Sequence, residues 1–173
     1  MDFPIRDAVF GRYWKSSFQT LYAFITVTAK RVYLIPVEVP VLSTVDRVCY
    51  ICGGASAGNV RVGIYGSVGD SPQGAPLKAQ SQSYPKPGAS RTCEIITGPV
   101  QLPKGLYWAA WVSDESTTQL PVPYAEEITG GTLQQYYYTL ASYGPLTDPC
   151  PAVTGGASTQ RGSLFKLRVS NVP

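Results

Sequence analysis

Short runs of β-branched and aromatic residues, separated by glycine and proline, recur along the whole chain. Within residues 59–66, Val60, Val62 and Ile64 alternate with other residue types, which is the two-residue period of a strand with one buried face. Pro36 implies that its strand lies at a sheet edge or carries a bulge. About eight strands are expected, drawn from residues 22–29, 31–39, 44–51, 59–66, 77–83, 92–97, 106–113, 132–140 and 163–170.

The run at residues 106–113 is uncharged and follows a Pro-Lys-Gly sequence that is typical of a turn. On a strand, Tyr107 and Trp111 share one face, and Trp108 lies on the other. Both faces are apolar, so we expect this strand to be covered on both sides. One cover is the core of the domain. The other is either a loop of the same chain or a second protein.

These patterns predict an all-β protein, a single eight-stranded jelly-roll sandwich or barrel preceded by an N-terminal arm. The arm comprises residues 1–19 and the jelly-roll domain residues 20–173. Large apolar residues are mixed with basic ones in the arm, so it either docks on another molecule or packs under its own barrel. Residues 141–162 are expected to form a long loop, and loops of that length are usually functional or disordered.

Charged residues make up only 14% of the chain, against about 25% in ordinary soluble domains. The net charge of +3 is spread along the sequence, so a nucleic-acid partner is not expected. A surface with few charges suits a protein that shares its surface with neighbours, although a neutral surface rich in Ser, Thr and Gln fits equally. The first residues lack the features of a signal peptide, and no apolar run is long enough to span a bilayer.

The chain has few of the side chains that enzymes commonly use for catalysis. Histidine is absent, which removes the commonest general base, the commonest metal ligand and every triad that needs it. The carboxylate pairs Asp114-Glu115 and Glu126-Glu127 are adjacent in sequence, and adjacent residues on a strand point to opposite faces. We therefore expect no enzymatic activity, no catalytic residues and no cofactor.

The four cysteines are Cys49, Cys52, Cys93 and Cys150. The first two have the spacing of half a zinc site, but the other two lie far apart, so no metal site is expected. A disulfide is possible, with three connectivities open to four cysteines. Buried, inert thiols are the remaining interpretation.

Aromatic residues near the end of the chain allow two interpretations. Exposed tyrosines on a β-sandwich can stack on sugars, and Tyr136, Tyr137, Tyr138 and Tyr143 are the candidates. Alternatively, alternate members of the tyrosine run face the core and the others face a neighbour or solvent. Glycan binding therefore remains the alternative function, as in a receptor-binding module of a phage fibre or an adhesin.

The chain as a whole resembles the small major capsid proteins of tailless, membrane-containing icosahedral phages that infect Thermus. The resemblance rests on the length of 173 residues, the aromatic arm from Phe3 to Phe18 and the expected strands. The Gly-Leu-Tyr-Trp-Ala stretch that begins at Gly105 and the Ser-Leu-Phe-Lys-Leu-Arg-Val run that begins at Ser163 fit the same pattern.

This resemblance implies a single jelly roll that dimerises by exchange of strands or arms. It also implies co-assembly with a second, larger capsid protein over an internal viral membrane. The source would be thermophilic, where disulfides occur even inside cells, although the chain lacks the usual enrichment in Lys and Glu. We therefore expect a structural virion protein, located in the capsid, whose mechanism is assembly.

The expected homodimer interface joins the arm of one chain to the barrel of the other. Free termini are usually polar, whereas this arm is aromatic, and exchange of identical elements gives a symmetric dimer. The interface residues expected from the arm and the central strand are Phe10, Tyr13, Trp14, Phe18, Tyr107 and Trp111.

Overall fold

The computed structural model describes residues 12–15, 22–54, 58–86, 90–116, 118–123, 133–158 and 165–171. The regular secondary structure of this part of the chain is entirely β-strand, with no helix. Accordingly, no helix within the described ranges has the length and hydrophobicity to cross a bilayer.

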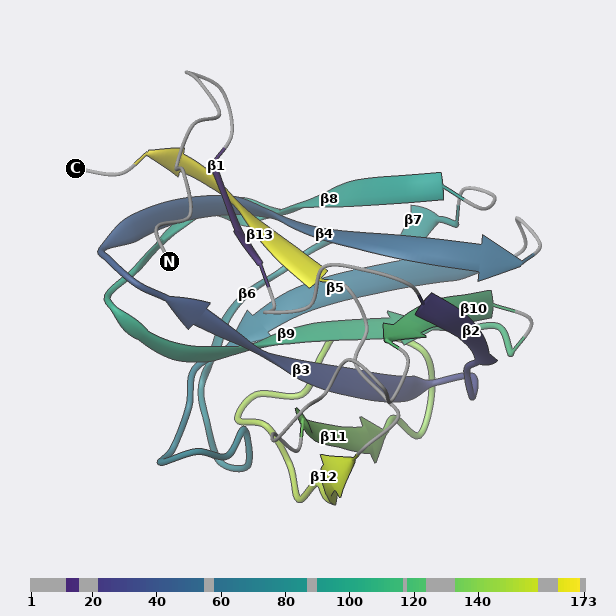
Figure 1. Cartoon of the computed structure of the whole chain (residues 1–173). Coiled ribbons are helices and arrows are strands. Elements are labelled where there is room, and N and C mark those ends of the chain that lie inside the picture. The colour runs from purple at the N-terminus through teal and green to yellow at the C-terminus, as the bar shows by residue number, and fades with distance from the viewer. Residues whose placement is uncertain are drawn as a thin grey trace.

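The strands form two antiparallel sheets that face each other as a β-sandwich (Figure 1). The described residues contain the strands β1 (Arg12–Lys15), β2 (Tyr22–Thr26), β3 (Arg31–Val39), β4 (Ser43–Gly54), β5 (Asn59–Tyr65), β6 (Leu77–Gln80), β7 (Tyr84–Pro85), β8 (Ser90–Leu102), β9 (Gly105–Ser113), β10 (Thr118–Pro123), β11 (Leu133–Thr139), β12 (Thr154–Ser158) and β13 (Phe165–Asn171).

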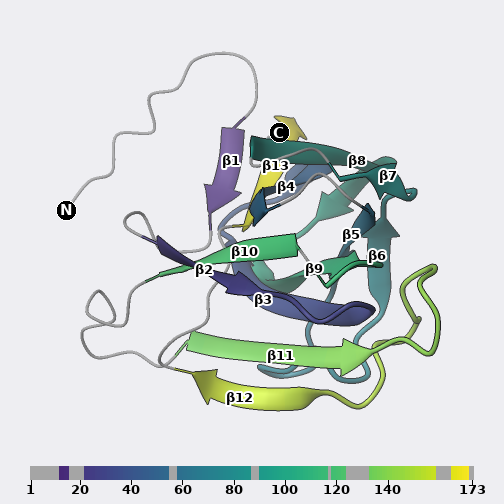
Figure 2. The same ribbon diagram turned by 90° about the vertical axis from the view of Figure 1, so that its right-hand side faces the viewer.

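The first sheet has the order β1-β13-β4-β10-β2, with β8 paired to the other side of β4. The second has the order β12-β11-β3-β9-β5-β6, with β7 also paired to β5. Figure 2 shows β1, β13 and β4 at one side of the molecule and β11 and β12 at the other. The predicted strand at residues 106–113 is thus β9, in the middle of the second sheet between β3 and β5.

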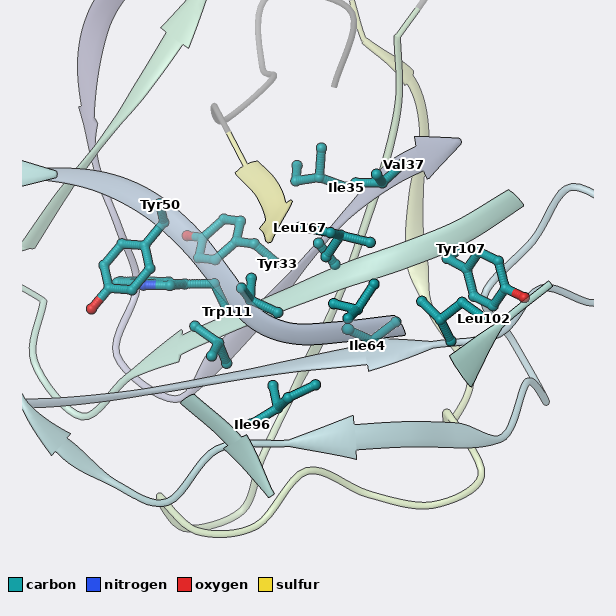
Figure 3. Close-up of a cluster of buried hydrophobic side chains, with 14 of the residues drawn as sticks. Tyr33, Ile35, Val37, Tyr50, Ile64, Ile96, Leu102, Tyr107, Trp111 and Leu167 are labelled. Carbon is teal, nitrogen blue, oxygen red and sulfur yellow. The ribbon is translucent and has the colours of Figure 1, made fainter. Parts of the chain in front are cut away.

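The main core lies between the two sheets and follows from the alternation seen in the sequence. Val60, Val62 and Ile64 of β5 point into it, together with Trp111 of the neighbouring strand β9 and Leu167 of β13 in the opposite sheet. Figure 3 shows Ile64, Trp111 and Leu167 among the aromatic and aliphatic side chains that converge from both sheets. Each of the five is inaccessible to solvent, and burying a side chain of this size contributes about 1.5–3 kcal/mol.

The sequence predicted β3 with its observed bounds, but the structure has more strands than the eight expected. Several are short, such as β7 with 2 residues, and β10 carries two prolines, so neither has a clear hydrophobic alternation. The predicted loop at residues 141–162 contains β12. Pro36 lies in a strand with neighbours on both sides, but β11 pairs only as far as Leu34, so one side of the strand is open at the proline.

Candidate functional site

The described part of the arm adds a strand to the first sheet. Residues 12–15 form β1, which pairs with β13, with Tyr13 opposite Arg168 and Trp14 opposite Leu167. The other two arm residues of the expected interface, Phe10 and Phe18, lie outside the described residues. The expected boundary at residue 19 divides the arm from the jelly-roll domain. Residues 12–15 of the arm nevertheless pair through their backbone with β13, the last strand of that domain.

Tyr107 and Trp111, the expected interface residues on the central strand, lie in the main core. Tyr107 is 7% exposed and Trp111 is 0% exposed. The ring of Trp111 contacts those of Tyr33 and Tyr50, with centroid distances of 6.3 and 6.1 Å. Both side chains are buried in this fold, because alternation on β9 points them toward the opposite sheet.

The second apolar face of β9 is covered by the chain itself. Residues 140–153, here called the strap, cross this face and close a second cluster of buried side chains around Trp108 and Ala110. The indole Nε1 of Trp108 donates to Ser67 Oγ at 3.2 Å, and the ring of Tyr136 packs edge-on at 5.3 Å. Of the two covers that the sequence allowed, the structure thus contains the loop of the same chain.

Hydrogen bonds from two tyrosines fix the strap. The hydroxyl of Tyr65 donates to the carbonyl of Thr147 at 2.6 Å and lies 2.7 Å from the hydroxyl of Tyr138. Because Tyr65 has only one hydroxyl proton, Tyr138 must donate to it. The amide of Thr147 donates back to Tyr138 at 3.4 Å, so the three residues form a closed ring of donors and acceptors.

Further bonds hold the strap on either side of this ring. The amide of Leu146 donates to Gln80 Oε1 at 3.0 Å, and Asp148 Oδ1 accepts from the amide of Leu77 at 2.9 Å. The backbone of Cys150 pairs with those of Gly74 and Ala75. Burial raises the pKa of the Tyr65 and Tyr138 hydroxyls and raises that of the Cys150 thiol to about 12. The strap is therefore an integral layer of the fold, with Asp148 as its one charged residue.

The cysteines fall into two environments. Cys49 of β4 is disulfide-bonded, and the residue directly opposite it on β8 is Cys93. Cys52 lies on the same strand as Cys49, opposite Ser90. Cys150 is a free, buried thiol in the strap. No three His, Cys, Asp or Glu side chains gather as a metal site within the described ranges.

One of the two carboxylate pairs is described, and its aspartate has a structural contact. Both oxygens of Asp114 accept hydrogen bonds from Asn59, at 2.6 Å from the backbone nitrogen and 2.8 Å from Nδ2. This contact joins the end of β9 to the start of β5. The second pair, Glu126 and Glu127, lies outside the described residues.

The tyrosines proposed for sugar stacking are engaged within the chain. Tyr138 belongs to the strap ring, and Tyr136 packs on Trp108. The guanidinium of Arg31 lies 4.4 Å from the ring centroid of Tyr137. The hydroxyl of Tyr143 lies 2.9 Å from Ser83 Oγ.

Comparison with known proteins gives no relative: no family model, no curated protein and no solved structure matches this chain.

Proposed function

We propose that the chain is a structural virion protein, a jelly-roll building block of an icosahedral capsid. In this proposal it assembles with a second copy of itself and with a larger capsid protein, near an internal viral membrane. The support is the resemblance seen in the sequence, together with a two-sheet β-sandwich whose strands end in frequent turns. Assembly then requires no chemical step, only the burial of surface between protomers.

The observation that carries the proposal is the position of β1. It is an edge strand of 4 residues that joins β13 through backbone pairing. Backbone pairing is the same whether the strand comes from its own chain or from another copy. An arm that adds a strand to a neighbouring subunit is therefore a direct means of building a shell.

The chain connection favours exchange of this strand. In the first sheet β1 and β2 lie at opposite ends of the strand order, although only residues 16–21 separate them in sequence. A short connection in the sequence favours swapping between copies, because the exchanged strand keeps the same backbone contacts. A symmetric dimer is the expected product.

Electron microscopy of particles from the native source, combined with quantitative mass spectrometry, tests the proposal. A capsid building block should be present in hundreds of copies per particle and should account for repeated density in the shell. Absence of this chain from purified particles, or its presence in only a few copies at a vertex or fibre, would refute the capsid role.

A further inference from the structure

We draw no further inference here: the strongest candidate, the buried side chain of Lys86 directly after β7, whose Nζ has no hydrogen-bond partner among the described residues, carries no proposal because residues 87–89, which follow it, lie outside the described part of the chain and nothing in the structure shows what this amino group faces.

Discussion

The hydroxyls of Tyr65 and Tyr138 lie 2.7 Å apart beneath the strap, although 73 residues separate them in sequence. Through the backbone of Thr147 they close a ring in which every donor has an acceptor. A buried network of this kind stabilises the fold by more than the sum of its separate hydrogen bonds, because an unpaired polar group in the interior costs free energy. This ring ties residues 140–153 to β5 and β11, so that the apolar second face of β9 is covered.

Removing one hydroxyl from the ring should loosen the strap. Tyr138→Phe leaves the Thr147 amide without an acceptor and removes the donor to the Tyr65 oxygen, so the free energy of unfolding should fall by about 1–3 kcal/mol. Urea denaturation measures this change. Tyr143→Phe is the control, because its contact with Ser83 is exposed and its loss should cost less than about 0.5 kcal/mol. Equal effects of the two substitutions would argue against a structural role for the ring.

Close packing of the strap leaves no space for a side chain at Gly63 of β5. A Cβ atom there would clash with Leu146 Cδ1 and touch the carbonyl of Ala79 at 3.0 Å. We expect Gly63→Ala to destabilise the fold by about 1–3 kcal/mol, the usual cost of overpacking. At Gly105 the nearest atom is 3.7 Å away, so Gly105→Ala should be tolerated. Thermal unfolding of both variants makes the comparison, and a stable Gly63→Ala protein would show that the strap is loosely packed.

The register predicts the partner of Cys49 in its disulfide. Cys93 lies directly opposite on β8, where Cα atoms are about 4.5–5.5 Å apart, within the span of a disulfide. Cys52 is three residues further along β4, about 10 Å away on an extended strand. Non-reducing peptide mapping should therefore find Cys49 joined to Cys93, and reduction should cost about 2–4 kcal/mol. A Cys49–Cys52 peptide would contradict the register of the first sheet.

Burial of the Cys150 thiol makes the fold sensitive to alkali. The pKa of this thiol rises from an ordinary value of 9.0 to about 12 in the folded chain, so the unfolded chain loses the proton first. The contribution to stability is complete below pH 9 and is lost as the pH rises from there toward 12, by about 1.4 kcal/mol per pH unit. Urea unfolding between pH 8 and 10 should show a shallower decline for Cys150→Ala than for the unaltered chain. Parallel declines would show that the thiol does not contribute.

The sequence predicted an all-β protein, because the content of β-branched and aromatic residues in β3, β5 and β9 is a local property. It also showed that β9 is apolar on both faces. Whether a loop or another protein covers the second face could not be derived, because the ring of Tyr65, Tyr138 and Thr147 depends on distant segments. The alternation of Val60, Val62 and Ile64 also implies that Tyr65 lies on the other face of β5, and Tyr65 does lie there, beneath the strap.

The candidate sites were harder to predict than the fold. Trp111 was selected as an interface residue because of its size and apolar character, which serve a core equally well. The sequence did not predict the ion pair between Asp46 and Arg168, because 122 positions separate the two residues. Their contact depends on the pairing of β4 with β13 and on the bulge at Asp46, and no local pattern encodes either.

The central claim is that the arm assembles one copy with another by strand exchange. It is tested most directly by a cross-link between β1 and β13. Lys15 and Lys166 are directly opposite each other in the register. One preparation carries Lys15→Cys and another carries Lys166→Cys, so a disulfide between these two new cysteines can form only between chains. Both would also carry Cys52→Ser and Cys150→Ser, and would be mixed, refolded together and mildly oxidised. Exchange predicts a covalent dimer of the two variants. The account is contradicted if the mixture stays monomeric while a chain carrying both new cysteines closes the cross-link within itself.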